Sequence, residues 1–124
     1  MAKKILVADD EEKYRTMHTE RLEKAGYSVH TVNSGEEAAA VLASDENLDG
    51  VVLDGKMPPG DEGLIVLGSI RQGKYGEVRK QIPVLICSTY LHEFSTADKT
   101  GGEFLNKHAM ESVYMSVVRQ LFGG

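Results

Sequence analysis

Several side chains able to do chemistry stand directly after short apolar runs of this chain. Asp9 and Asp10 follow the run Ile5–Ala8, and Asp54 follows Val51–Leu53. The other polar side chains in equivalent positions are Ser88, Thr89 and Lys107. Carboxylates, hydroxyls and an ammonium group are the groups that bind a divalent cation and phosphoryl oxygens.

Carboxylates brought close together repel one another, so they either keep protons or recruit a hard cation. Mg²⁺ suits them best, because it prefers oxygen ligands in octahedral geometry and retains several waters. A lysine ammonium can pair with phosphoryl oxygens, and a serine hydroxyl can donate a hydrogen bond to one. Phosphoryl transfer to a carboxylate is mostly positioning and charge neutralisation. These residue types therefore predict a Mg²⁺-dependent phosphoryl-transfer site, provided that the fold brings them together.

The elements that must position these residues begin with short apolar runs, which are typical of strands buried on both faces of a parallel sheet. The runs are Ile5–Ala8, Ser28–Val32, Val51–Leu53, Val84–Cys87 and Glu103–Leu105.

Segments with helical spacing separate these strands. Their apolar positions are Tyr14, Met17, Leu22 and Ala25 in the first, Ala38, Val41 and Leu42 in the second, Leu64, Leu67 and Ile70 in the third, and one stripe of Met110, Val113, Tyr114, Val117, Val118, Leu121 and Phe122 in the last. Gly26 and Gly73 supply stop signals, and Ser34 with Glu37 forms a capping box. A weaker pattern at Tyr90–Ala97 predicts a short helix between the last two strands.

Alternating strands and helices predict an α/β fold, a parallel five-stranded sheet with helices on both faces. We expect the flavodoxin-like (βα)5 arrangement, with strand order 2-1-3-4-5. Sites in such sheets form at the carboxyl ends of strands, where the winding changes direction. In this order the carboxylates, hydroxyls and lysine converge on one rim.

The composition excludes several classes of protein. The chain has 124 residues, 41% hydrophobic and 27% charged, which is the balance of a single globular domain. Its net charge of −5, without clustered basic residues, argues against direct binding to nucleic acid. Cys87 is the only cysteine, so a disulfide framework is excluded and a reducing cytoplasm is expected. The run Ile5–Ala8 is too short for a signal peptide or a membrane span.

Four segments, KILVADDEE, VVLDGKMP, PVLICST and FLNK, resemble the landmarks of response-regulator receiver domains of two-component signal transduction. The resemblance covers essentially the whole chain and implies one receiver (response regulatory) domain over residues 1–124. It implies a phosphoprotein that signals in a phosphorelay. Such a domain is not a conventional enzyme, although it catalyses its own phosphorylation and slow autodephosphorylation.

The resemblance also implies a metal and acceptor set. Asp54 resembles the phosphoacceptor. Asp10 resembles a direct Mg²⁺ ligand and Asp9 its water-mediated companion. Lys56 resembles the position whose backbone carbonyl completes the metal shell.

Three further residues resemble the family's catalytic and switch positions. Lys107 resembles the lysine that pairs with the phosphoryl group, and Ser88 the hydroxyl that swings toward it. Phe104 resembles the aromatic that turns inward as the hydroxyl moves. The implied donor is a phosphohistidine of a histidine kinase or a histidine phosphotransfer protein. The implied recipient is a downstream protein or a fused output domain, with a phosphorylation-dependent dimer as a further expectation.

The chain departs from the family pattern in four places. The loop GKMPPGDEGL after Asp54 is one residue longer than usual before its glycine. His108 follows Lys107 where the family usually has proline, and a non-proline cis bond costs about 3 kcal/mol, which argues against a cis peptide there. The stretch Gln72–Gln81 is expanded, and the segment from Ser88 to Lys107 is shorter than usual. We therefore expect a short or irregular fourth helix.

Simpler interpretations of single residues stay open at this point. Asp10 could be only a helix N-cap, Ser88 an ordinary buried hydroxyl and Phe104 an ordinary core residue. Cys87 is expected to be a buried apolar residue. The four histidines, which show no ligand spacing, are His18, His30, His92 and His108.

Three other functions compete with the receiver interpretation. A flavodoxin-type cofactor binder would place phosphate after the first strand, where Asp9 and Asp10 would repel it. A dehalogenase-type phosphatase needs a second aspartate two residues after its nucleophile, where this chain has Lys56. A pseudo-receiver that acts as a phosphorylation-independent interaction module remains the strongest alternative. The sequence leaves open whether the domain acts alone or in a longer protein.

Overall fold

The computed structural model describes residues 2–89 and 101–123. Its elements are β1 (Lys4–Ala8), α1 (Glu12–Lys24), β2 (Ser28–Val32), α2 (Gly35–Ala43), β3 (Gly50–Leu53), α3 (Glu62–Arg71), α4 (Glu77–Lys80), β4 (Val84–Ser88), β5 (Glu103–Asn106) and α5 (Glu111–Phe122). Each predicted strand lies within one residue of its observed bounds.

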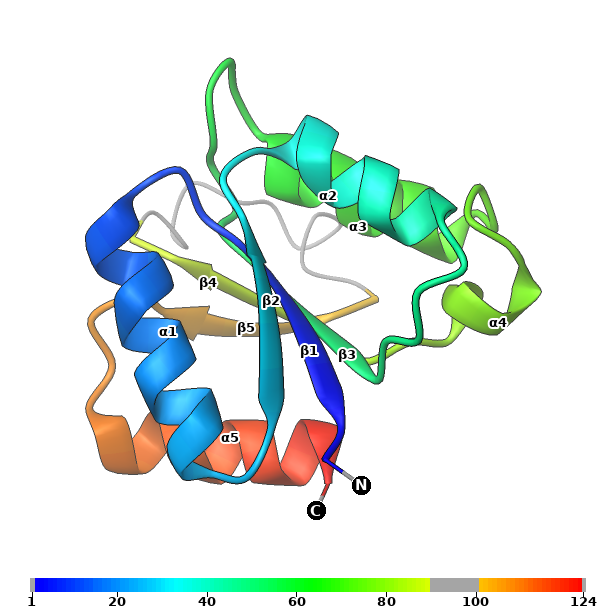
Figure 1. Cartoon of the computed structure of the whole chain (residues 1–124). Helices are drawn as coiled ribbons and strands as arrows, with labels where there is room; N and C mark the ends of the chain where they lie inside the picture. Colours follow the sequence, from blue (N-terminus) through cyan, green and yellow to red (C-terminus); the bar gives the residue numbers. More distant parts are fainter. Residues whose placement is uncertain (1, 90–100, 124) are drawn as a thin grey trace.

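The strands form one parallel sheet in the order β2-β1-β3-β4-β5, as the sequence predicts. Helices α2 and α3 cover one face of the sheet, and α1 and α5 cover the other (Figure 1). The chain therefore has the α/β, flavodoxin-like fold.

Alternation along β1 shows how the two faces are filled. Ile5 and Val7 belong to the apolar cluster under α1 and α5, whereas Leu6 and Ala8 belong to the cluster under α2 and α3. Successive side chains of a strand point to opposite faces of the sheet. A strand that is apolar at odd and even positions therefore packs against the helices on both faces. Burial of each such aliphatic side chain stabilises the folded state by roughly 1.5–3 kcal/mol relative to leaving it exposed to water.

The expectation that all strands are buried on both faces is wrong for the two edge strands. Residues of β1, β3 and β4 are buried almost throughout, but β2 is mostly half-buried and its Thr31 is exposed. In β5 the terminal Glu103 and Asn106 are exposed. The covering helices lie over the middle of the sheet, so the edge strands have less apolar surface to pack against.

The predicted start and stop signals are present. Gly26 and Gly73 have φ of 96° and 81° after α1 and α3, a conformation that favours glycine. Ser34 Oγ accepts a 3.1 Å hydrogen bond from the Glu37 N–H at the start of α2. The return bond of the capping box is displaced by one residue, because Glu37 Oε1 accepts from the Asn33 N–H at 2.8 Å.

The apolar stripe of the last helix is only partly a core stripe. Tyr114, Val118 and Phe122 are buried as expected, but Met110 is 72% exposed and Val113 is 46% exposed. Met110 is the N-cap residue of α5 and lies outside the helix proper, so the helical period does not apply to it.

The short α4 lies in the expanded connection between α3 and β4. Arg79 ties it to the end of α2 and to the loop that follows, donating from Nε to the Leu42 carbonyl at 3.1 Å and from Nη2 to the Glu46 carbonyl at 2.6 Å. The helix predicted at Tyr90–Ala97, in the crossover between β4 and β5, falls outside the described residues.

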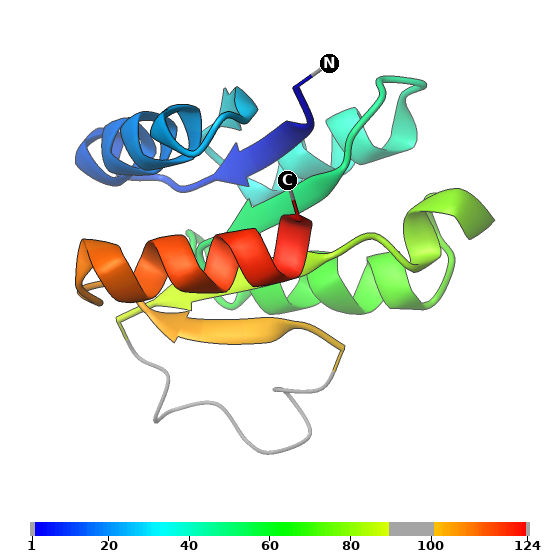
Figure 2. The ribbon, with the colours of Figure 1, turned by 90° about the horizontal axis from the view of Figure 1, so that it is seen from below.

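The two ends of the described chain lie at the same end of the sheet (Figure 1), and the view from below shows the C-terminus at the end of α5 (Figure 2). Lys3 Nζ donates a 2.8 Å hydrogen bond to the Phe122 carbonyl at the C-terminus of that helix. Within residues 2–89 and 101–123, every helix is too short or too polar to cross a membrane.

Candidate functional site

The backbone ladder of the sheet extends beyond its strands and carries site residues with it. Asp54 N–H donates to the Ala8 carbonyl at 2.9 Å, and Lys107 N–H donates to the Ser88 carbonyl at 3.0 Å. These bonds hold the first residues after β3 and β5 in the plane of the sheet. The positions of Asp54 and Lys107 are therefore determined by strand pairing.

The Lys107 ammonium bridges two buried carboxylates. Its Nζ lies 2.8 Å from Asp9 Oδ2 and 2.9 Å from Asp54 Oδ2. Only 3% of the lysine side chain is exposed, and the side chains of Asp9 and Asp54 are 1% and 6% exposed. Charges at this depth interact more strongly than on the surface, because less water screens them.

Asp10 completes a cluster that we call the acidic edge, which consists of Asp9, Asp10, Asp54 and Lys107. One oxygen from each of the three carboxylates lies within 4.8 Å of one from each of the others. Asp10 is exposed, whereas the other two carboxylates are buried. The acidic edge therefore opens to solvent on the side of Asp10.

The Asp10 N-cap interpretation is not supported. The N-cap of α1 is Glu11, which makes no side-chain capping bond. Asp9 Oδ1, and not Asp10, accepts the Glu11 N–H at 2.9 Å. After the neighbouring strand β3, Asp54 Oδ1 accepts a longer, 3.3 Å hydrogen bond from the Lys56 N–H.

Burial raises the pKa of the two buried carboxylates of the acidic edge. Burial, with a smaller contribution from the Asp9 charge, raises the pKa of Asp54 to about 6 against the lowering effect of Lys107. Burial likewise raises the pKa of Asp9. Burial lowers the pKa of Lys107, but the two carboxylates outweigh it and the net pKa is raised. The lysine is thus held charged, while two carboxylates share its one positive charge.

These residues fit a hard divalent cation. Three carboxylates and one ammonium leave a formal charge of −2 when all are ionised. Asp9 Oδ2 is buried and, among the described residues, accepts no hydrogen bond of ordinary angular geometry despite its ion pair with Lys107. Closely spaced carboxylate oxygens with unsatisfied acceptor capacity are the ligands that Mg²⁺ prefers.

Gly63 allows the start of α3 to approach the acceptor strand. A Cβ at this position would lie 2.0 Å from the Asp54 carbonyl oxygen, a distance no side chain tolerates. The Gly63 N–H donates to the Gly55 carbonyl at 3.2 Å. The long loop after Asp54 therefore returns to pack directly against its backbone.

Sequence reasoning missed two residues of α1 that contact the acidic edge. Arg15 Nη1 donates a 2.8 Å hydrogen bond to the Asp9 carbonyl, and Lys107 Nζ lies 4.2 Å from the centroid of the Tyr14 ring. The sequence pattern places Tyr14 in the core stripe of the first helix. Its place one helical turn after the acidic pair was the available signal.

Comparison with known proteins adds the family. The sequence model of the response regulator receiver domain matches residues 5–113. The chain belongs to this family. The transcriptional regulatory protein PhoP for alkaline phosphatase synthesis, from Bacillus subtilis, is 40% identical over 94 residues, which cover 76% of this chain and 36% of PhoP. The receiver thus spans about a third of that relative.

Solved receiver structures superpose over nearly the whole chain. The response regulator TrrA of Thermotoga maritima, in complex with Mg²⁺ and BeF, has a TM-score of 0.82 at 32% identity, covering 96% of this chain and 98% of that one. A response regulator receiver protein of Sinorhizobium medicae also has a TM-score of 0.82, at 28% identity, covering 99% and 96%. The receiver fold therefore accounts for the entire architecture described above.

The remaining receiver landmarks lie around the acidic edge in different environments. Ser88 is fully buried at the end of β4. Phe104 in β5 is half-buried against the apolar cluster under α2 and α3. The described part of the chain has one cis peptide, Pro58-Pro59, so the bond after Lys107 is trans. The switch roles of Ser88 and Phe104 stay predictions.

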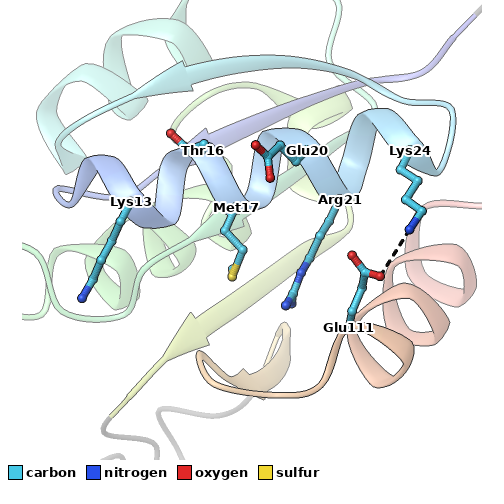
Figure 3. A pocket seen from close by; sticks show the side chains of 7 residues that line it. All are labelled: Lys13, Thr16, Met17, Glu20, Arg21, Lys24 and Glu111. Atoms are coloured by element: carbon cyan, nitrogen blue, oxygen red, sulfur yellow. Dashed lines mark hydrogen bonds and ion pairs between the residues drawn. The ribbon is translucent and has the colours of Figure 1, made fainter.

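A separate hollow of about 450 Å³ lies between α1 and α5 (Figure 3). It is lined by Lys13, Thr16, Met17, Glu20, Arg21, Lys24 and Glu111. Lys24 Nζ and Glu111 Oε2 form a 3.4 Å ion pair across it. Its lining carries both signs of charge and includes no residue of the acidic edge, so it is distinct from the receiver site.

Proposed function

We propose that this receiver domain accepts a phosphoryl group on Asp54 in a Mg²⁺-dependent reaction. The observation that carries the proposal is the Lys107 ammonium held 2.8 Å from Asp9 and 2.9 Å from Asp54, with the exposed Asp10 carboxylate beside them. An acceptor carboxylate, a cation site and a fixed lysine are what phosphoryl transfer to a carboxylate needs.

In the proposed step an Asp54 carboxylate oxygen attacks the phosphorus of the donor. The new O–P bond forms as the donor's bond to phosphorus breaks, and the electron pair of that bond leaves with the donor. Lys107 pairs with phosphoryl oxygens. Asp9, Asp10, Asp54 and the Lys56 backbone carbonyl would hold Mg²⁺, which supplies charge neutralisation when bound.

The pKa of about 6 supports Asp54 as a nucleophile near neutral pH. At pH 7 the carboxylate is mostly ionised and can attack. Its burial keeps water away from the acyl phosphate that would form. The high pKa also indicates an ionised carboxylate that is poorly stabilised before a cation arrives.

Membership of the receiver family supports a proposal about partners. The donor that we propose is a phosphohistidine on a histidine kinase or a phosphotransfer protein. Ser88 would then move toward the phosphoryl group and Phe104 would turn inward, which changes the surface that binds a downstream protein or output domain. TrrA, in complex with Mg²⁺ and BeF, supports a similar site chemistry for this chain.

Incubation with Mg²⁺ and acetyl phosphate or beryllofluoride tests the proposal. We expect one phosphoryl adduct by intact-mass spectrometry, lost in Asp54→Asn and retained in Asp45→Asn, which makes the same chemical change at an exposed position outside the site. Labelling of Asp54→Asn at the wild-type level would refute the acceptor assignment. Absence of labelling and of a beryllofluoride effect in wild type would favour a phosphorylation-independent interaction module.

A further inference from the structure

Tyr14 presents its aromatic face to the lysine of the acidic edge. Lys107 Nζ lies 4.2 Å from the ring centroid, well within the range of about 6 Å over which a cation–π attraction acts. Tyr14 is half-buried in the first turn of α1, and Lys107 is buried at the end of β5. The contact therefore joins two segments that are far apart in the sequence.

The Tyr14 ring is a third neighbour of the Lys107 ammonium, beside the Asp9 and Asp54 carboxylates. Asp9 and Asp54 hold Lys107 through one oxygen each, at 2.8 and 2.9 Å. A lysine ammonium is a point charge on a flexible stem, so two monodentate contacts restrain its position less than a fork of donors would. An aromatic face beside it adds a restraint and excludes water from that side.

Tyr14 is itself held against the segment that carries the lysine. Its ring meets the His108 ring in an edge arrangement, with centroids 6.1 Å apart. Tyr14 therefore packs on two successive residues after β5. A second ammonium, Lys13 Nζ, lies 5.1 Å from the Tyr14 ring, but its side chain is 73% exposed and better screened.

We propose that Tyr14 is a positioning residue for Lys107. Its ring keeps the ammonium beside Asp54, so that phosphoryl oxygens meet a charge already in place. This inference rests on the proposed function, because it assigns Tyr14 a part in the same transfer. Preorganised charge lowers a barrier because the protein need not reorganise during the reaction.

The contact involves the ring and not the hydroxyl. Within residues 2–89 and 101–123, the Tyr14 ring contacts Lys107 and its hydroxyl makes no hydrogen bond. Tyr14→Phe keeps the aromatic face, whereas Tyr14→Leu keeps an apolar side chain but removes the face. The two variants therefore separate the cation–π contact from simple packing.

The kinetic experiment measures phosphorylation by acetyl phosphate at saturating Mg²⁺. We expect Tyr14→Phe to stay within about twofold of wild type, and Tyr14→Leu to lose roughly three- to thirtyfold in maximal rate, the range of a cation–π contact between exposed and desolvated sites. The half-saturating concentration should change little. Tyr75→Leu, the same change at another half-buried tyrosine, is the matched control.

A double-mutant cycle tests whether Tyr14 acts through the lysine. In a Lys107→Met background, Tyr14→Leu should cause no further loss of rate. A loss as large as in the wild-type background would overturn the proposal, and so would a wild-type rate in Tyr14→Leu or an equal loss in Tyr14→Phe.

A second readout does not depend on phosphorylation. Proton exchange between the Lys107 ammonium and water, measured by NMR in the Mg²⁺-free protein, should be at least threefold faster in Tyr14→Leu than in wild type and Tyr14→Phe. Equal exchange in all three would overturn the positioning role. If wild type takes up neither phosphoryl group nor beryllofluoride, the proposed function fails, and the exchange rates still decide whether Tyr14 holds Lys107.

Discussion

Two groups of buried polar side chains beside α1 differ in how their atoms are satisfied. At the acidic edge, two buried carboxylates share one lysine. Between α1 and α5, His18 Nδ1 and the Tyr114 hydroxyl form a 2.7 Å hydrogen bond within the core. The first place concentrates charge, whereas the second contains a neutral pair.

Burial keeps the second pair uncharged. It lowers the pKa of His18 to about 3 and raises the pKa of Tyr114. The Arg21 guanidinium lies 5.0 Å from the Tyr114 ring and disfavours a positive charge on His18. Figure 3 shows Arg21 pointing from α1 toward α5. His18 therefore links α1 to α5 through its hydrogen bond to Tyr114 and stays neutral.

Buried neutral pairs and buried charges have different consequences for the protein. A neutral hydrogen-bonded pair satisfies its own members and stabilises packing. The acidic edge has more negative charge than its one lysine can neutralise, so its residues fit a cation from solution. Buried charge that the protein leaves partly uncompensated is therefore the better indicator of function.

Removal of the Lys107 charge should change the unfolding free energy more than any other substitution considered below. Lys107→Met leaves Asp9 and Asp54 buried without a cation, which should cost about 3 kcal/mol of unfolding free energy at neutral pH without Mg²⁺. Urea unfolding measures this loss. The loss should shrink toward pH 4 as the carboxylates take up protons, and a loss that does not vary with pH would contradict the electrostatic explanation.

The neutral pair should respond differently. Tyr114→Phe leaves the buried His18 Nδ1 without its partner and should cost roughly 1–2 kcal/mol. Because His18 is neutral above its unfolded pKa, this cost should be the same between about pH 7 and pH 9, with or without Mg²⁺. A dependence on Mg²⁺ would show that the pair is coupled to the acidic edge.

Mg²⁺ itself should stabilise only an intact acidic edge. At about ten times its dissociation constant, the ion should add roughly 1.4 kcal/mol to the unfolding free energy of wild type. Asp10→Ala should weaken this response and leave the Mg²⁺-free fold intact, because Asp10 is exposed. An unchanged Mg²⁺ titration in this variant would refute the ligand assignment.

Removal of the acceptor charge should have the smallest effect and the opposite sign. The pKa of Asp54 is raised from 3.8 to about 6, so the native state loses stability as pH rises through that window. Asp54→Asn removes the penalty and leaves Lys107 paired with Asp9. We expect the Mg²⁺-free variant to be about 1 kcal/mol more stable than wild type at pH 8, roughly 4 °C in midpoint.

The advantage of Asp54→Asn should vanish below about pH 4, where the carboxylate is protonated in both folded and unfolded chains. Thermal unfolding across this pH range provides the measurement. Asp45→Asn, at an exposed carboxylate, is the control for a general change in charge. A variant less stable than wild type at pH 8 would mean that the Lys107 pair outweighs the burial of Asp54.

Local patterns in the sequence were sufficient to predict the strands, their order and the rim on which Asp9, Asp54 and Lys107 meet. Strands that are apolar at consecutive positions predict a sheet covered on both faces. Polar residues that follow such strands must lie at the carboxyl edge of the sheet. The sequence also predicts the helix ends at Gly26 and Gly73 and the Ser34 N-cap, because each depends on the backbone of only a few neighbouring residues.

Only the tertiary structure decided which side chains share an environment. The exposure of Thr31 and Met110 depends on where the covering helices end, and the contact of Tyr14 with Lys107 depends on how α1 lies against the end of β5. Periodicity identifies the face of an element but not what packs on it. The sequence alone therefore determined the elements and the chemistry at their ends, while packing determined which atoms hold that chemistry in place.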